Sequence, residues 1–521
     1  FLNDSLAFNG YTLFAPVSHT TTWLIDNCGE VVHTWESDYR PGMMAYLDAD
    51  GSLWRACRIN STFNAGGTGG RIEHHNWEGD LLWAYDYSGP DYHQHHDIEP
   101  LPNGHVLLIA WERHTYQEAI DAGRDPGTTP ANGLWSERIV ELKPVGGNQA
   151  EVVWMWRAWD HLVQDFDSTK ANYGIVADHP GRIDINYHEL GGVGNMTDWL
   201  HINAIDYNAE RDEIMLSVRN FSEIWVIDHG TTTAEAAGPA GDLLWRWGNP
   251  AAYGRGTPAD QQLFGQHDAH WIPEGHPGAG QVLVFNNGAG RPDGQYSTVE
   301  QIAPPLDADG HYLWPDDGPF LPEAPAWTYV PDPPFFAQRV SGAQRLPNGN
   351  TLICNGPRGH VFEVTPDGQL VWDYVNPVRN GGPVSQGTTI TQNDIFRATR
   401  YAPDHPAFEG RDLTPQGPVE LDPLPSDCVI YGAPVTAVAG PHLPEGIYLQ
   451  GNLTDSALRL INESTTTLTV TLVSATGQIF ARRTCPPGAH TFALDHLPKG
   501  MYFVHVLAKN GATHTFRAVR Y

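Results

Sequence analysis

Three side chains suited to holding an anion lie within one stretch, DWLHINAIDYNAERDEIMLSVRN, which spans residues 198–220. His201 and Asn203 stand near its start, two positions apart, and so share one face of a predicted strand. Arg219 follows at the far end of the next strand. A guanidinium supplies paired donors to sulfate or phosphate oxygens, and a neutral imidazole can act as a nucleophile. The stretch therefore predicts chemistry on a tetrahedral anion.

The chain around this stretch repeats. A strand centred on a tryptophan recurs six times, and each time a loop follows, then a second unit with a turn signal and an apolar strand. These tryptophans are Trp35, Trp83, Trp154, Trp245, Trp327 and Trp372. About four short strands per unit, without any helical pattern, are typical of propeller blades, whereas a solenoid would show a uniform period. We predict an all-β fold with a six-bladed β-propeller over residues 1–412.

The last part of the chain changes character twice. Residues 413–442 are rich in Pro and Gly, which is a linker composition. Residues 443–521 contain about six or seven short strand patterns, which predict a small Ig-like β-sandwich.

The composition excludes several classes of partner. Lys and Arg number 30 and Asp and Glu 61, which gives a net charge of -31 at pH 7. A field of that sign repels nucleic acid and anionic membrane surfaces. No apolar run reaches the ~18 residues that a membrane span requires. The first residue is Phe1 rather than Met, which a removed signal peptide would explain, so we expect a secreted or cell-surface protein.

Five cysteines are present without a C-x-x-C pair, which argues against a zinc knuckle. In an oxidising compartment Cys28 could pair with Cys57, and Cys428 with Cys485. The odd count leaves at least one thiol free. We expect that thiol to be Cys354, because it lies in an apolar strand.

Three histidines occupy one position of the repeat when the second units are aligned at their turns, and we call it the ring position. They are His96, His201 and His267. In the remaining units the same position is taken by Met43, Ser341 and Arg397. Equivalent points of propeller blades surround the central channel, so we predict that the three imidazoles converge there.

Two chemistries suit three histidines in a ring. One is a zinc site with an open position, and the other is group transfer through a histidine nucleophile. A cationic Arg219 beside a zinc triad would be unfavourable, so the combination favours an oxyanion reaction without a metal. Asp97 and Asp268 each follow a ring histidine, and we predict turn or supporting roles for them.

Motifs for other cofactors are missing or weak. The sequence has no G-x-x-x-x-G-K-[ST] loop and no G-x-S-x-G motif. Four acidic residues in turns could hold a structural calcium ion, although plain hairpin turns are the favoured interpretation. They are Asp48, Asp50, Asp307 and Asp309.

Several motifs resemble one enzyme family. HHDIEPLPNG, DWLHINAIDYN, SVRNFSEIWVID, GQHDAHW and SGAQRLPNGNTL are similar to segments of the bacterial arylsulfate sulfotransferases. The resemblance covers about residues 8–412. It implies a six-bladed propeller of the periplasm or cell exterior that moves a sulfuryl group from one phenol to another without a nucleotide cofactor. Aryl sulfates and phenols would be its small-molecule partners.

The resemblance also implies roles for single residues. His267 resembles the family's nucleophile, and His96 a channel histidine that exchanges protons with the phenol oxygens. His201, Asn203 and Arg219 resemble the groups that hold the sulfuryl oxygens. We expect no counterpart of the family's extra N-terminal β-domain.

Three further residues are candidates for substrate binding. Ser341 is the nearest counterpart of a threonine hydroxyl near the family's site, Arg397 shares the ring position, and Trp199 could stack on an aryl ring. Packing between blades is the plainer interpretation of Trp199.

The C-terminal motif LPKGMYFVHVLAKNG resembles the sorting domains of type IX secretion. That resemblance implies export across the outer membrane by the secretion machinery. Two other functions stay open. One is a secreted, non-catalytic propeller that binds glycans or surface proteins, and the other is an aryl sulfate hydrolase that uses water as acceptor.

Overall fold

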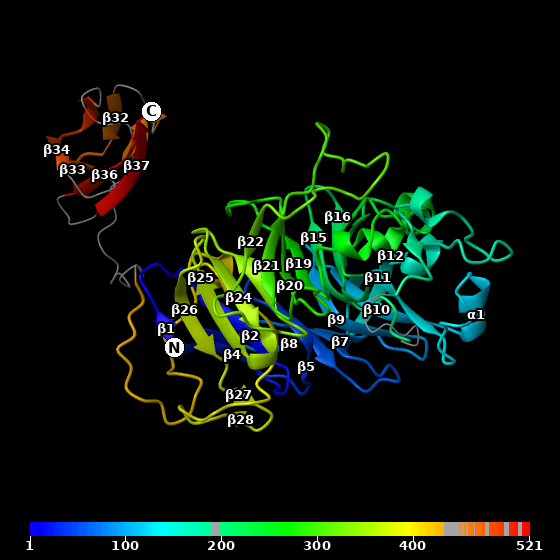
Figure 1. The fold of residues 1–521 in the computed structure, drawn as a ribbon. Helices are drawn as coiled ribbons and strands as arrows, with labels where there is room; N and C mark the ends of the chain where they lie inside the picture. The colour runs from blue at the N-terminus through cyan, green and yellow to red at the C-terminus, as the bar shows by residue number, and fades with distance from the viewer. Residues whose placement is uncertain are drawn as a thin grey trace. The chain divides into compact units, whose positions relative to one another are not determined.

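The chain forms two compact units, residues 1–431 and 432–521, in the computed structural model (Figure 1). The structure describes residues 1–188, 197–431, 447–450, 453–454, 457–462, 464–474, 479–493, 497, 500–508 and 513–520. The predicted linker therefore lies partly outside the described residues, at positions 432–442. No helix in the described ranges is long and apolar enough to cross a membrane.

Nearly all regular structure in the described residues is β-structure, as the sequence predicted. The α-helices are short and number two there: α1 (Tyr116–Asp121) and α2 (Thr233–Ala236). Single 3-10 turns are η1 (Ala158–His161), η2 (Val176–Asp178), η3 (Arg219–Phe221), η4 (Pro239–Gly241), η5 (Pro250–Tyr253), η6 (Pro258–Asp260), η7 (Gly356–Arg358) and η8 (Pro406–Phe408).

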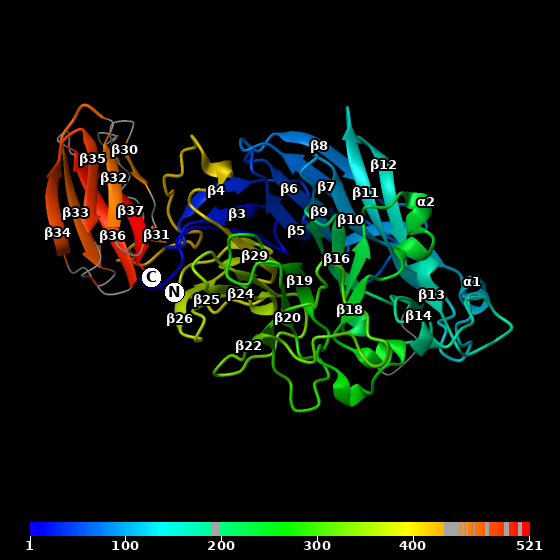
Figure 2. The ribbon, with the colours of Figure 1, turned by 90° about the horizontal axis from the view of Figure 1, so that it is seen from above.

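Six antiparallel sheets of four or five strands make up most of the described part of the first unit (Figure 2). One contains β5 (Pro41–Leu47), β6 (Leu53–Arg58), β7 (Gly70–His75) and β8 (Leu81–Asp86). A second contains β9 (Tyr92–Pro100), β10 (Val106–His114), β11 (Leu134–Val145) and β12 (Gln149–Arg157). A third contains β15 (Ile202–Asn208), β16 (Glu213–Val218), β17 (Glu223–Asp228) and β18 (Trp245–Trp247). A fourth contains β19 (His267–Trp271), β20 (Val282–Asn286), β21 (Thr298–Ile302) and β22 (Trp327–Tyr329).

The last two sheets join the beginning of the unit to its end. One has the order β29-β2-β3-β4, and the other β1-β26-β25-β24-β23. Their strands are β1 (Leu2–Asn3), β2 (Tyr11–Pro16), β3 (Thr22–Ile25), β4 (Val31–Trp35), β23 (Gly342–Arg345), β24 (Thr351–Asn355), β25 (His360–Val364), β26 (Leu370–Val375) and β29 (Ile395–Tyr401). Small two-stranded sheets pair β13 (Leu162–Val163) with β14 (Ile183–Asp184), and β27 (Val378–Arg379) with β28 (Gly382–Pro383). Because β2 pairs with β29 and β1 with β26, the chain closes on itself.

The repeated tryptophans explain why neighbouring sheets hold together. Five of them lie on the fourth strand of a sheet with exposures of 6% or less. The indole nitrogen of each donates to the next sheet along the chain or to the loops beside it. The acceptors of Trp35, Trp83, Trp154, Trp245 and Trp372 are Asn76 O, Gln149 O, Thr231 Oγ1, Leu321 O and Asn27 O. The repeat therefore supplies both apolar packing and a directional bond between consecutive sheets.

The disulfide differs from the predicted pairs. Cys28 is bonded to Cys428, while Cys57, Cys354 and Cys485 are free and buried. The expectation of a free Cys354 is confirmed, and both predicted pairs are wrong. The prediction paired cysteines that are close in sequence, whereas the two bonded cysteines are 400 residues apart. The disulfide fastens the end of the first unit to the loop between β3 and β4.

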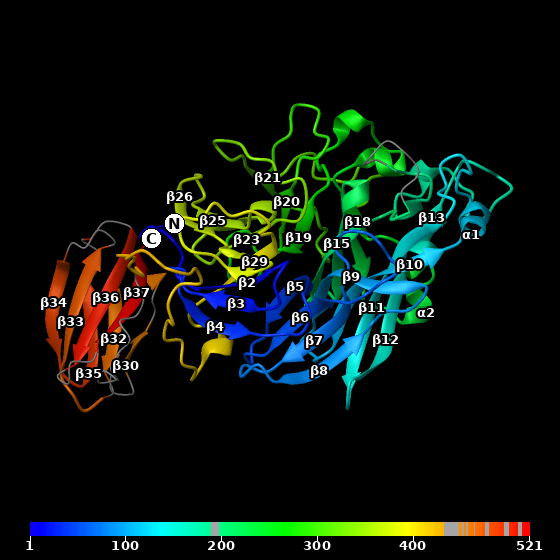
Figure 3. The same cartoon turned by 90° about the horizontal axis from the view of Figure 1, so that it is seen from below.

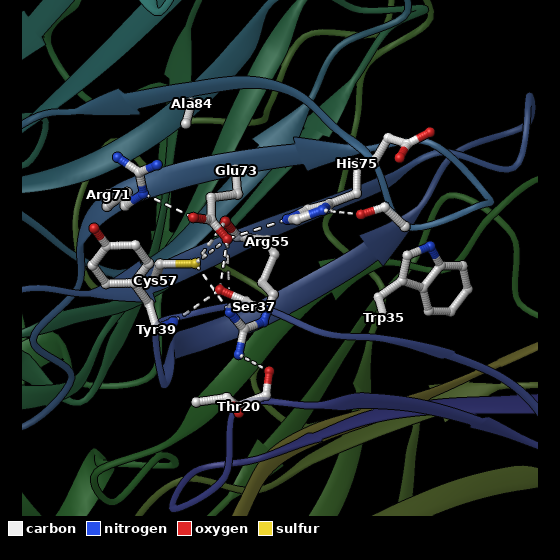
Figure 4. A network of polar contacts seen from close by, with 12 residues as sticks. Thr20, Trp35, Ser37, Tyr39, Arg55, Cys57, Arg71, Glu73, His75 and Ala84 are labelled. Atoms are coloured by element: carbon white, nitrogen blue, oxygen red, sulfur yellow. Dashed lines mark hydrogen bonds and ion pairs between the residues drawn. The ribbon is translucent and has the colours of Figure 1, made fainter.

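Cys57 is unavailable for pairing because it lies in a buried polar network (Figure 4). Its Sγ is 3.3 Å from Oε2 of Glu73 and 3.1 Å from Nη1 of Arg55. Glu73 also accepts from Arg71 at 2.8 Å and from Ser37 Oγ at 2.8 Å. Burial raises the pKa of the Cys57 thiol to about 12, so the thiol stays protonated.

The second unit contains two sheets in its described residues. One has the order β30-β32-β35 and the other β31-β37-β36-β33-β34. Their strands are β30 (Ile447–Gln450), β31 (Leu453–Thr454), β32 (Ala457–Asn462), β33 (Leu468–Ser474), β34 (Ile479–Cys485), β35 (Gly488–Ala493), β36 (Gly500–Ala508) and β37 (Thr513–Arg520). Leu460, Val470 and Val504 are fully buried in their common core. Residues 413–431 belong to the first unit, where Pro418 bridges Glu30.

Candidate active site

The histidines of the ring position lie on the first strands of three neighbouring sheets. His96 is in β9, His201 directly precedes β15, and His267 begins β19. Strand β15 contacts both β9 and β19, and Figure 3 shows the three strands side by side. The structure thus brings together three sheets at the positions that the repeat predicted.

The same positions share an unusual backbone. Positive φ angles occur at Met43 (108°), His96 (52°), His201 (54°), Asp268 (60°) and Ser341 (88°). Register shifts accompany them, for example between Ile202 and Ala204 and between His267 and His270. A bulge re-aims a side chain, and a left-handed non-glycine residue costs about 1–3 kcal/mol. Positive φ at the repeat position in four sheets, and one residue later, at Asp268, in a fifth, points to a site that the fold is built to present.

Ring contacts place the imidazoles around one small volume. The centroids of His96 and His201 are 4.6 Å apart, with planes inclined by 72°. Phe396 on β29 lies 6.1 Å from His96 and 6.4 Å from His267, again between ring centroids. His96 Nδ1 lies 2.8 Å from Nδ1 of His95. A single aromatic ring therefore contacts two of the three histidines.

His267 is held on both sides of its ring. Its Nδ1 lies 2.8 Å from Oδ1 of Asn287, and the backbone N–H of Val340 donates to its Nε2 at 3.2 Å. The residue is 2% exposed, so water does not compete for these contacts. The imidazole is fixed before any ligand arrives.

Burial and neighbouring charge keep His267 and His96 neutral. Burial lowers the pKa of His267 well below its ordinary value, and Arg219 lowers it further. Burial lowers the pKa of His96 in the same way, with added repulsion from His201, His95, His267 and Arg219. A neutral imidazole has the lone pair that nucleophilic attack or proton acceptance requires. Arg219 acts on both rings, so its cation is close to both.

His201 has a carboxylate partner that the sequence did not reveal as such. Its Nδ1 lies 2.5 Å from Oδ2 of Asp198, whose Oδ1 accepts from Nε1 of Trp111 at 2.9 Å. The carboxylate therefore accepts a hydrogen bond from Nδ1–H, which leaves Nε2 as the nitrogen available to a ligand.

Asn203 and Arg219 lie beside these rings. Asn203 Nδ2 donates to the backbone oxygen of Gln266 at 2.8 Å, one residue before His267. Its Oδ1 is buried and has no hydrogen-bond partner among the described atoms. Arg219 follows β16 in η3, where its N–H donates to His201 O at 3.3 Å. The stretch around residues 198–220 thus places all three of its predicted side chains beside one strand end.

The remaining three candidates have other partners. Arg397 forms ion pairs with Asp97 and with Asp268, the latter at 2.8 Å, so its charge is neutralised inside the protein. Ser341 Oγ donates to Arg339 O and accepts from Gly356 N–H, which commits it to its own turn.

Trp199 is 3% exposed within the largest hydrophobic core. Its Nε1 donates to Tyr187 O at 3.1 Å, and its ring packs on Phe221 at 5.6 Å. The packing interpretation therefore fits this tryptophan better than stacking on an aryl ring.

A metal-binding geometry occurs elsewhere in the described residues. Among them, Asp307, Asp309 and His311 form the only group of three or more potential ligands close enough to share an ion, and all three are exposed. Oδ1 of Asp307 accepts from the backbone N–H groups of the other two, at 2.8 and 2.9 Å, as in an ordinary turn. These contacts give no independent support for an ion.

Sequence reasoning missed Asp198 and Asn287 as partners of the ring histidines. Asp198 stands three residues before His201, a spacing without meaning until the bulge turns the chain. Asn287 ends the run VLVFNN and is twenty positions from its partner. A search for polar residues directly after each second strand would have found Asn287 and Arg219 together.

Comparison with known proteins identifies one sequence family. The model of the family described as Arylsulfotransferase (ASST) matches residues 12–303. None of the curated proteins matches the chain.

Solved structures are only distantly similar. A protein of unknown function from Bacteroides caccae is 12% identical, with 76% of this chain and 99% of that chain covered and a TM-score of 0.39. The periplasmic gluconolactonase of Pseudomonas aeruginosa is 10% identical, with 93% and 99% covered and a TM-score of 0.35. Such low identities and TM-scores assign no function.

Proposed function

Because the chain belongs to the arylsulfotransferase family, we propose that it transfers a sulfuryl group from an aryl sulfate to a phenol. The transfer passes through a sulfo-histidine at His267 and uses no nucleotide cofactor. One observation carries this proposal: neutral, buried His96 and His267 lie beside His201 and the cation of Arg219. That set joins a nucleophile to a group that attracts an anion, in a site largely closed to water.

In the first half of the reaction, the Nε2 lone pair of His267 attacks sulfur. The bond between sulfur and the aryl oxygen breaks, and its electron pair leaves with that oxygen. The N–H of neutral His96 donates a hydrogen bond to the departing phenolate, which takes up its proton from solvent. Arg219, Asn203 and His201 hold the sulfuryl oxygens, and His201 donates to them in the form that carries a proton on Nε2 as well as on Nδ1. Each preorganised donor of this kind is worth about 3–4 kcal/mol in other enzymes.

In the second half, the acceptor phenol occupies the place of the first. Its oxygen attacks sulfur while neutral His96 takes the phenolic proton and passes it to solvent. The bond between sulfur and Nε2 breaks, and its electron pair returns to His267. Atoms and charge balance over the two halves, so no further reactant is needed.

Architecture and location belong to the same proposal. We infer that the six sheets of the first unit are the blades of a six-bladed propeller, with the histidines at its central channel. The second unit is an Ig-like sandwich that acts as a type IX sorting domain. The protein is accordingly secreted or held at the cell surface, where the secretion machinery is its partner.

A direct assay tests the activity. The protein is incubated with 4-nitrophenyl sulfate and phenol, and nitrophenol release is followed. We expect release by the wild type and its loss in H267A. H33Q is the control, since His33 lies on β4, the fourth strand of its sheet, and bonds Trp77 O at 2.6 Å. A folded wild type without activity, or an H267A variant as active as the wild type, would overturn the assignment.

Omitting phenol separates the transferase from a hydrolase. A transferase releases nitrophenol much faster with phenol and forms phenyl sulfate, whereas a hydrolase releases it equally well without phenol and forms inorganic sulfate. Inactivity on every aryl sulfate would favour a non-catalytic propeller that binds glycans or surface proteins.

A further inference from the structure

Asn287 has only one way to orient its amide. The residue follows β20 and is fully buried. Its Nδ2 donates to two backbone oxygens, Ala337 O at 2.6 Å and Val340 O at 3.0 Å. Both hydrogens of the amide are then used, and a flipped amide would face these carbonyls with its own oxygen. Oδ1 is therefore the atom that faces His267.

The fixed amide decides which nitrogen of His267 carries the proton. Oδ1 of Asn287 has no hydrogen, so its 2.8 Å contact with Nδ1 requires that Nδ1 be the protonated nitrogen. On the other side of the ring, the N–H of Val340 is a donor only, so its contact with Nε2 requires a lone pair there. Two independent neighbours demand the same tautomer.

We propose that Asn287 is a positioning residue that holds His267 in the Nδ1–H tautomer, so that Nε2 keeps the lone pair with which it attacks once its hydrogen bond from Val340 N–H is released. This inference rests on the proposed function for its catalytic meaning. Asn287 does not touch the sulfuryl group and acts through the ring.

The backbone beside Val340 supports a site shaped for this purpose. Val340 has φ of 47° and Ser341 of 88°, and a left-handed β-branched residue is rare outside constrained turns. The turn directs the oxygen of Val340 to Asn287 and its N–H to His267. One strained residue thus contacts both partners of the tautomer, which accounts for the strain.

The same contact stabilises the charged intermediate. When Nε2 bonds to sulfur and the aryl oxygen departs, the ring gains a positive charge and keeps its Nδ1 proton. The hydrogen bond to Oδ1 then becomes charge-assisted and stronger. Since the amide is far too weak a base to remove the proton, the ring remains a good leaving group for the second half.

A matched pair of variants tests the role. N287L removes the acceptor, and N286L removes an equally buried amide one residue earlier, at the end of β20. Asn286 also makes three bonds, from Nδ2 to Gln262 O and Glu300 Oε1 and from Phe264 N–H to Oδ1, but none to His267. Loss of a supporting partner of this kind typically costs about 10- to 100-fold in activity. We expect that loss for N287L and much less for N286L.

The tautomer itself is read without any substrate. Long-range proton–nitrogen spectra of histidine-labelled protein distinguish Nδ1–H from Nε2–H, and the signals of His267 are those missing in H267Q. We expect Nδ1–H in the wild type and in N286L, and a mixture of the two tautomers in N287L, where Val340 N–H alone still favours Nδ1–H. An Nε2–H wild type overturns the proposal even if N287L does not fold. So does an equal loss of activity in the two variants, or an Nδ1–H tautomer that persists unmixed in N287L.

The two proposals fail in different experiments. If the wild type shows the Nδ1–H tautomer but no activity on aryl sulfates, the proposed reaction is wrong and the positioning of the ring stands. If it is active with the Nε2–H tautomer, the reaction stands and the role of Asn287 is wrong.

Discussion

The Nδ1 atom of His201 lies 2.5 Å from Oδ2 of Asp198, and the second oxygen of that carboxylate accepts from the indole of Trp111. Asp198 is 7% exposed, and its position is fixed by this second bond. The pair therefore fixes the ring of His201, whose centroid lies 4.6 Å from that of His96. In the proposed reaction, a carboxylate in this place orients a histidine that holds the sulfuryl group.

D198N should lower kcat/KM by about 10²-fold, because an amide can turn its NH₂ toward Nδ1 and reverse the tautomer of His201. The measurement is nitrophenol release at saturating phenol. D242N is the matched control, since Asp242 bonds Nδ1 of His161 at 2.9 Å outside the ring. Equal activity of the two variants would show that Asp198 is structural only.

In a plot of activity against pH, the fall of activity on the acid side (the acid limb) should lie below pH 6.5. The pKa of His267 is lowered by burial and then by Arg219, so its reactive neutral form persists at pH values where an ordinary histidine is charged. R219Q should move the limb upward toward 6.5, in addition to slowing the reaction. R211Q is the control because Arg211 pairs with Glu213 at the other end of β16. A limb that stays in place in R219Q contradicts this account.

The same shifts predict weaker folding in acid. His96 and His267 resist protonation in the native state, while the unfolded chain takes up those protons near pH 6.5. The contribution of these two histidines to the free energy of unfolding is therefore fully present above pH 6.5. It is lost as the pH falls from there through their lower native pKa values. Urea midpoints measured from pH 8 to pH 5 check this. They also define the range in which the rate profile is valid.

The repeat allowed much of the site to be predicted because propeller-like sheets reuse one position. Aligning the turns was enough to bring His96, His201 and His267 together, and the shared bulge geometry explains why the alignment works. Side chains alternate along a regular strand, so their direction after a bulge does not follow from counting. That is why Asp97 and Asp268 were expected to have only supporting or turn roles, and their pairing with Arg397 was not foreseen.

Contacts across long separations carried no signal in a single sequence. Asn287 and Val340 reach His267 from a strand end and a turn whose positions depend on the whole sheet packing. The prediction of the disulfide was wrong for the same reason, since Cys428 is brought to Cys28 only when the chain closes through β1 and β26.

Counting thiols tests that closure. In denaturant without reductant we expect three reactive thiols per chain, from Cys57, Cys354 and Cys485, and five after reduction. The C28S variant should show four without reductant, because Cys428 is released. The sequence-based pairs would instead leave one thiol in the wild type, so the count separates the two patterns.

Arg397 should stabilise the first unit rather than bind substrate. R397M leaves Asp97 and Asp268 buried without their counter-ion, and loss of one partner of a buried pair costs about 3–5 kcal/mol. R339M removes a pair with Asp394 whose arginine is 48% exposed, and should cost at most about 1 kcal/mol.

Tryptophan fluorescence during urea unfolding measures the stability of the first unit alone, because all 18 tryptophans lie between Trp23 and Trp372. The expected result is a lower midpoint for R397M, with KM for the aryl sulfate close to that of the wild type in urea-free buffer. R397M could instead unfold at the wild-type midpoint and raise KM. The guanidinium of Arg397 in the wild type would then leave the carboxylates of Asp97 and Asp268 and bind the sulfuryl group during catalysis. The ring position would then mark a substrate ligand in four of the six sheets.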